Sequence, residues 1–242
     1  MALNAGAAAA VSWRDERQGP LPALLLVLTM VTGLVDAVSY LNLGHVFVAN
    51  MTGNVVFLGF AVADARDFSI PASLTATGAF LAGALGGGRL GSSAGHHRGR
   101  LLAIATYLKI ALVGAALIAS MLPLDSNGDL VRYALIVLLA MAMGLQNATA
   151  RRLGVPDLTT TVLTLTLTGI AADSTLAGGK NHGLARRLLA TFTMFLGAAV
   201  GAFVIFRFGV TAVLAIALAL LVTNGIAARH YSFSSDAWTV GS

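Results

Sequence analysis

Residues 33–63, GLVDAVSYLNLGHVFVANMTGNVVFLGFAVA, are the most informative stretch of this chain, because they place polar side chains within an apolar segment. The segment is apolar enough for lipid, yet it carries a carboxylate, hydroxyls and carboxamides. Polar side chains at membrane depth are costly, so they normally face a protein interior or a water-filled path. We expect such a path here, and its members in this segment are Asp36, Ser39, Asn50, Thr52, Gly53 and Asn54.

A weaker copy of this segment lies in the second half of the chain, at 144–173, GLQNATARRLGVPDLTTTVLTLTLTGIAAD. Gly33 corresponds to Gly144, and Asp36 corresponds to Asn147. The two segments therefore predict one site built from both halves of the chain. The second segment adds Gln146, Asn147, Thr160 and Thr164 to the expected path.

The composition places the chain in a membrane. Of its 242 residues, 57% are hydrophobic and only 10% are charged, with a mean hydropathy of +0.84; soluble domains have about 25% charged residues. The chain has no cysteine, which excludes disulfides, thiolate chemistry and cysteine metal sites. The chain has a net charge of +5, and its basic residues lie in short clusters between apolar segments. This distribution indicates that they orient the chain in a bilayer rather than bind nucleic acid.

The basic residues also predict the topology, because cytoplasmic loops carry an excess of Lys and Arg. Two short segments, 46–63 and 158–172, are rich in Asn, Thr and Gly. If they enter and leave by one side, with a cytoplasmic N-terminus, eleven basic residues are cytoplasmic and only Arg66, Arg132 and Arg207 are external. If both cross, the division is eight against six. The six remaining apolar segments are 21–41, 71–90, 101–122, 130–150, 184–206 and 210–228.

We therefore predict an all-α protein of the cell inner (cytoplasmic) membrane, with six transmembrane helices, two re-entrant or broken helical segments and both termini cytoplasmic. The membrane domain covers 20–229, between a mobile tail at 1–19 and a C-terminal tail at 230–242, of which we expect the polar residues 232–242 to be disordered. Segment 80–86 resembles 195–201, so the halves are about 20–123 and 129–229. Three crossings per half give the halves opposite orientations, which predicts a 3+3 inverted repeat.

These motifs resemble the YoaK-like family of bacterial inner-membrane proteins of unknown function. The resemblance covers 21 to about 229, and its most specific blocks are MTGN (51–54) and RRLGVPD (151–157). It implies a multi-pass membrane protein and supplies no substrate. The family often repeats the Thr52-Gly53 pair in its second half, where this chain has Thr164-Leu165.

Two ionisable residues fall inside predicted crossings. Asp36 needs a partner, a proton or water at that depth, and the alternatives are a functional carboxylate or a structural ion pair. Lys109 is the natural partner to consider. The alternative for Lys109 is that its long side chain reaches back to the cytoplasmic surface beside Arg98 and Arg100. Thr29 and Thr32 share a helix face with Asp36, and we expect their hydroxyls to bond back to their own helix.

Each short segment has features of a discontinuous helix. In the first, Asn50 and Asn54 flank Thr52-Gly53, where glycine would relax the helix and free its carbonyl groups. In the second, Pro156-Asp157 predicts a helix start, and Thr160 and Thr164 lie on one face of that helix. The alternative for the second segment is a threonine-rich helix that packs without touching a solute.

The sequence contains no P-loop, nucleophile elbow, HExxH motif or paired carboxylates, so we predict neither an enzyme nor a cofactor. The adjacent pair His96-His97 lacks further metal ligands. Glycines at 83, 87, 91, 197 and 201 predict close helix contacts within one protomer. They do not decide whether the protein forms a homo-oligomer.

Two functions remain. The first is a transporter or channel for an unidentified small solute or ion, with its path between the two discontinuous helices. The second is a non-transporting membrane assembly or sensing protein, in which the polar residues only hold helices together. The first predicts the lipid bilayer and a small solute or ion as partners, and no nucleic acid.

Overall fold

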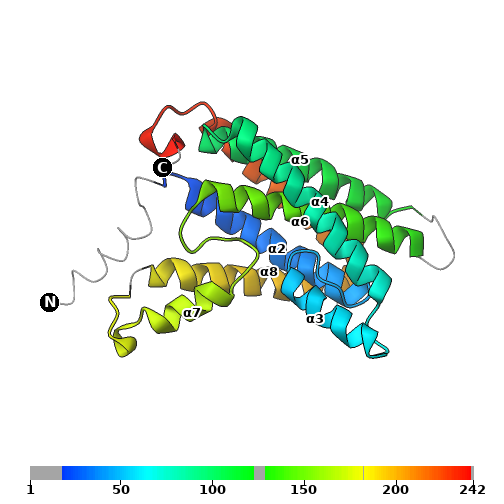
Figure 1. Ribbon diagram of the computed structural model, residues 1–242. Helices are drawn as coiled ribbons and strands as arrows, with labels where there is room; N and C mark the ends of the chain where they lie inside the picture. The colour runs from blue at the N-terminus through cyan, green and yellow to red at the C-terminus, as the bar shows by residue number, and fades with distance from the viewer. Residues whose placement is uncertain (1–17, 123–128, 182, 241–242) are drawn as a thin grey trace.

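The computed structural model describes residues 18–122, 129–181 and 183–240, and every regular element in those ranges is helical (Figure 1). The tail predicted for 1–19 lies almost wholly outside the described residues. Five described helices are long and apolar enough to cross a membrane. They are α2 (Leu21–Asn42), α4 (Ile70–Ala94), α5 (Arg98–Ala119), α6 (Asp129–Leu153) and α8 (Leu184–Tyr231).

Helix α8 is divided at Gly209, whose φ of 81° and ψ of 177° are not helical. This conformation is open to glycine because glycine has no Cβ. The division falls between the segments 184–206 and 210–228 that the sequence predicts as separate crossings. The first stretch packs on α2, whereas Gly225 in the second lies against Ile110 of α5. In Figure 1 the second stretch accordingly lies behind α5 rather than extending the first.

Helices α2 and α8 are in backbone contact through glycine. A Cβ placed on Gly33 would overlap the carbonyl oxygen of Met194, and one placed on Gly197 would overlap that of Met30. Gly201 also lies close to α2, where its Cβ would be 2.9 Å from that of Ala37. Small residues of this kind let membrane helices approach closely.

Helices α4 and α6 make the same kind of contact. A Cβ on Gly144 would overlap the carbonyl oxygen of Phe80, and one on Gly83 would overlap that of Met141. A Cβ on Gly87 would be 2.8 Å from the Cβ of Ala148. These contacts confirm that the glycine spacings fix helix packing within one protomer.

The two short helices begin later than the sequence predicts. The chain leaves α2 at Asn42 and resumes as α3 (Met51–Val62), so Thr52 and Gly53 lie in the first turn of α3 and the non-helical stretch is 43–50. Helix α7 (Thr164–Ala172) does not start at Pro156. Residues 154–163 are non-helical instead, with positive φ at Gly154, Asp157 and Thr160.

The C-terminal segment is folded, contrary to the predicted disorder of 232–242; residues 241–242 lie outside the described ranges. Residues 237–239 form the short helix η2 (Ala237–Thr239), and Trp238 is only 5% exposed. The Arg98 guanidinium at the start of α5 donates to the Trp238 carbonyl at 3.3 Å. One buried indole thus anchors a segment whose polar composition indicates a free tail.

Candidate functional site

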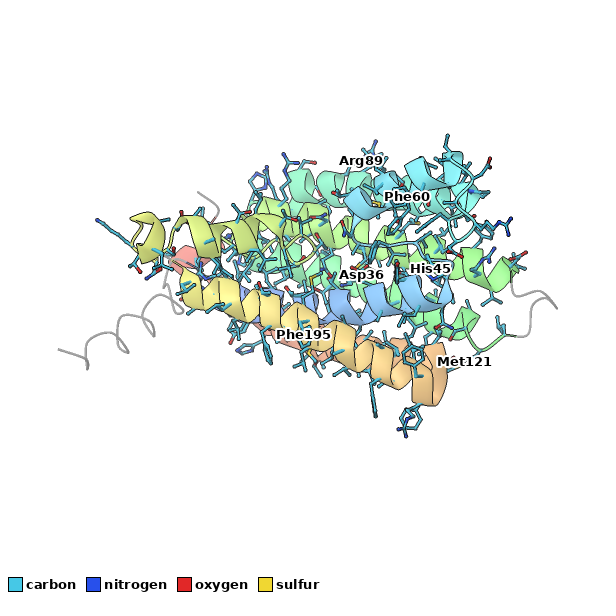
Figure 2. All side chains as sticks on the ribbon, turned by 90° about the horizontal axis from the view of Figure 1, so that it is seen from below. Asp36, His45, Phe60, Arg89, Met121 and Phe195 are labelled. Carbon is cyan, nitrogen blue, oxygen red and sulfur yellow. The ribbon has the colours of Figure 1, made fainter. Side chains whose placement is uncertain are left out.

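A cavity of about 350 Å³ lies where the two non-helical stretches meet α2 and α8. Figure 2 shows Asp36, on α2, inside the helical bundle near this junction. The cavity draws on both halves of the chain, as the paired sequence segments predict. Its lining residues are Gly33, Asp36, Phe47, Asn50, Thr161, Val162, Leu163, Thr164, Leu167, Met194 and Ala198.

Asp36 is the one ionisable side chain in that lining. Its Oδ1 atom accepts a hydrogen bond from the Ala49 backbone N–H at 3.3 Å, which ties α2 to the 43–50 stretch. The three ion pairs of the described residues involve other acids, namely Asp129, Asp157 and Asp173. The carboxylate therefore faces the cavity without a cationic side chain beside it.

Lys109 belongs to a separate, fully enclosed cluster. It is 2% exposed, and its Nζ donates to Oε1 of Gln146 on α6. The structure thus contains neither an Asp36–Lys109 ion pair among its described residues nor a Lys109 side chain that reaches the surface. The amide group of Gln146 donates in turn to Oγ1 of Thr32 on α2 and Oγ1 of Thr160, both at 2.9 Å.

This buried cluster adjoins the cavity through two backbone connections. Thr32 and Asp36 are four residues apart, hence on the same face of α2. Thr160 in the cluster is followed directly by Thr161 in the cavity lining. The hydrogen-bonded cluster of Thr32, Gln146 and Lys109 therefore lies one helical turn along α2 from Asp36.

Thr160 holds an unfavourable backbone conformation within this cluster. Its φ of 64° is rare for any residue with a Cβ and an outlier for a β-branched one. The hydrogen bond from Gln146 fixes the Thr160 hydroxyl where that strain occurs. Strained backbone of this kind concentrates at ligand clamps and moving segments.

Three of the predicted path residues support the site rather than line the cavity, and a fourth, Thr52, lies outside the cavity lining. The Asn54 carboxamide accepts from the Phe47 N–H at 2.8 Å and donates to the Phe47 carbonyl at 2.6 Å, which fixes the 43–50 stretch on α3. A Cβ on Gly53 would press on the Phe47 ring, so glycine leaves room for it. Ser39 bonds back to the Asp36 carbonyl at 3.2 Å, and Thr52 is exposed.

The helix-bonded hydroxyls expected on α2 are confirmed. Thr29 donates to the Leu25 carbonyl at 2.9 Å and Thr32 donates to the Leu28 carbonyl at 3.0 Å. Thr32 can also accept from Gln146, so only this one of the two threonines joins the buried cluster.

Asn147 lies apart from Asp36, although their sequence positions correspond. It lines a second cavity, of about 570 Å³, between α4 and α6. The structure therefore brings together Asp36, Asn50 and Thr164 around one cavity, and Lys109, Gln146 and Thr160 in the cluster beside it.

Arg187, at the start of α8, has a role that the sequence does not predict. Its Nε donates to Asp157 at 2.8 Å, and its Nη1 donates to Asp173 at 2.6 Å and to the Gly169 carbonyl at 2.5 Å. One guanidinium thus holds both ends of the second short segment against α8. Asp157 binds this arginine instead of capping a helix.

The cavity offers a carboxylate, a carboxamide and two threonine hydroxyls beside apolar side chains. Such a lining can bind a small polar or cationic solute and exchange a proton at Asp36. No group of three His, Cys, Asp or Glu side chains suited to a metal ion occurs among the described residues.

Residues 24–226 match the family described as "Protein of unknown function (DUF1275)". The chain is 32% identical over 155 residues to the UPF0700 transmembrane protein YoaK of Bacillus subtilis (strain 168), an alignment that covers 62% of this chain and 65% of that protein. The match thus spans less than two thirds of the relative's length. No solved structure matches. This chain is a membrane protein that belongs to the DUF1275 family of unknown function.

Proposed function

We propose that this protein is a membrane transporter or channel for a small solute or ion, which passes through the cavity beside Asp36. The observation that carries the proposal is the cavity itself, where two interrupted helical segments meet around one unpaired carboxylate. Non-helical backbone at membrane depth is tolerated where it is buried in protein or lines a water-filled cavity. Solute sites between discontinuous helices are typical of secondary transporters.

The glycine contacts support an inverted repeat as the framework of this transporter. Gly33 and Met30 of α2 occupy the positions that Gly144 and Met141 occupy on α6. Their partners Gly197 on α8 and Gly83 on α4 make equivalent contacts, one residue away from the register in which 80–86 resembles 195–201. The short helices α3 and α7 follow α2 and α6 in equivalent order.

In this framework the membrane is crossed six times, because α8 contributes two crossings on either side of Gly209. The short helices enter and leave by one side each. Both termini then lie in the cytoplasm, with Arg66 on the external side and the loop at 95–97 on the cytoplasmic side. The excess of cytoplasmic arginine and lysine supports this orientation.

Cysteine labelling tests the topology without background, since the natural chain has no cysteine. Single cysteines at Arg66 and Asp67 should react with a membrane-impermeant maleimide in intact cells, because this loop is external. Those at His96 and Lys180, both exposed, should react only after permeabilisation. External labelling at His96 would reject the six-crossing arrangement in favour of eight crossings.

A solute screen tests transport itself. The unfolding temperature of the purified protein is measured with one solute at a time, chosen from small cations, amines, amino acids and sugars. Each solute that raises the unfolding temperature is then assayed for uptake into proteoliposomes. A solute of the cavity should stabilise the wild type, whereas Asn50→Leu should abolish this effect. Absence of any stabilising solute, together with unchanged behaviour of Asn50→Leu, would favour the non-transporting function.

A further inference from the structure

A second cavity, distinct from the one at Asp36, follows the seam between α4 and α6. We call it the α4–α6 groove; its volume is about 570 Å³. We propose that the α4–α6 groove is a binding site for a phospholipid with an anionic headgroup. Its lining residues are Phe80, Ala84, Gly87, Gly88, Gly91, Ser92, Asn147, Ala148, Arg151 and Arg152.

The length of the groove matches one leaflet of a bilayer. Helices α4 and α6 run in the same direction, since Gly83 lies against Met141 and Gly91 against Arg152. The lining extends along α4 from Phe80 to Ser92, which at 1.5 Å per residue is about 18 Å. Half of the hydrocarbon core measures about 15 Å.

The chemistry of the groove changes along that length as a phospholipid does. Its deep end is lined by Phe80, Ala84 and glycines, which present an apolar surface. Its other end carries Arg151 and Arg152 in the last turn of α6. Asn147 lies about one helical turn deeper than Arg151, where its carboxamide can bond to the ester groups of a lipid.

Charge favours an anionic headgroup. No acidic residue lines the groove, and neither Arg151 nor Arg152 takes part in the three ion pairs of the described residues. The Arg152 side chain packs with its Cγ 3.3 Å from the Cβ position of Gly91, which directs its guanidinium to the helix end. Basic pockets between transmembrane helices are recognised sites for anionic lipid headgroups.

The bilayer also has direct access to the groove. Only α4 and α6 line it, and Leu81 and Leu85 on the neighbouring face of α4 are 56% and 63% exposed. Leucines exposed to this degree on a membrane-length helix contact lipid tails. The end of a membrane-spanning helix lies near lipid headgroups on either side of the membrane, so Arg151 and Arg152 are near headgroups whichever way α6 crosses.

The test measures lipid binding to the full chain by native mass spectrometry and by the rise in unfolding temperature. Micelles contain either phosphatidylglycerol or phosphatidylcholine. The wild type should bind phosphatidylglycerol and be stabilised by it. Replacement of both arginines, Arg151→Gln with Arg152→Gln, should weaken this binding about 25-fold, since each basic residue near an anionic surface contributes about fivefold. Arg100→Gln, an exposed arginine outside the groove, is the control.

A second pair of variants tests the acyl-chain end. A Cβ on Gly88 or on Gly86 would meet no atom within 4 Å, so both positions of α4 accept leucine, and only Gly88 lines the groove. Gly88→Leu should weaken phosphatidylglycerol binding at least tenfold, since each displaced CH₂ contributes about fourfold. Gly86→Leu should bind like the wild type.

Three results would overturn the proposal. The first is equal binding of phosphatidylglycerol and phosphatidylcholine by the wild type. The second is loss of binding in the arginine variant but not in Gly88→Leu, together with full competition by inorganic phosphate; this would identify a site for a free anion. The third is unchanged binding in both variants, which would place lipid elsewhere on the surface.

Discussion

Substitution of Gly144 by alanine should prevent the α4–α6 contact and cause one of the largest losses of stability that an added methyl group can produce at a glycine of the described residues. The new Cβ would overlap the backbone carbonyl oxygen of Phe80 and lie 2.8 Å from the nitrogen of Ala84. Overpacking typically costs about 1–3 kcal/mol, and here the obstacle is backbone, which cannot rotate away. We expect a cost of about 3 kcal/mol or failure to fold.

The matched control is Gly114→Ala on α5, where a Cβ would meet no atom within 4 Å. This variant should be neutral or more stable by up to about 1 kcal/mol, because alanine favours the helix over glycine. The measurement is thermal unfolding in detergent, followed by the fraction that remains monodisperse. Equal unfolding temperatures for the two variants would show that α4 and α6 are further apart than described.

Much of the framework follows from the sequence because its cause is local. Glycine spacing predicts close helix contacts at these glycines, and the structure confirms them at Gly83, Gly87 and Gly197. Hydropathy predicts the long apolar helices, and the polar clusters identify the two interrupted stretches. The division of α8 follows from the interruption between the apolar segments 184–206 and 210–228. Gly209 lies in this interruption, and its non-helical backbone conformation is one that glycine adopts readily.

The partners of the site residues could not be predicted, because they depend on how helices are rotated about their axes. The helices are apolar on nearly all sides, so no polar face reveals that Lys109 meets Gln146 rather than Asp36. The same reason conceals the contact of Arg187 with Asp157 and Asp173. Composition also gives the wrong prediction for the C-terminal segment, because the single buried side chain of Trp238 holds this otherwise polar segment on the fold.

Asp36→Asn should abolish the pH dependence of transport while the protein remains folded. Asparagine keeps the size of aspartate and an oxygen that can accept from the Ala49 N–H, so the tie between α2 and the 43–50 stretch is preserved. It loses the charge and the capacity to exchange a proton. Wild-type uptake of a solute identified in the screen should vary between about pH 5 and pH 8, whereas uptake by the variant should be constant.

Lys109→Met provides the control that separates this role from a structural one. If Asp36 and Lys109 neutralised each other, Asp36→Asn would destabilise the fold and Lys109→Met would restore it. The structure contains no such pair among its described residues, since the Lys109 amine is bound to Gln146 on the far side of Thr32. We therefore expect Asp36→Asn to unfold at the wild-type temperature. The double variant, Asp36→Asn with Lys109→Met, should unfold at no higher temperature than Asp36→Asn alone. Unchanged uptake by Asp36→Asn across the whole pH range would exclude Asp36 as the coupling group and leave its carboxylate as a helix tie alone.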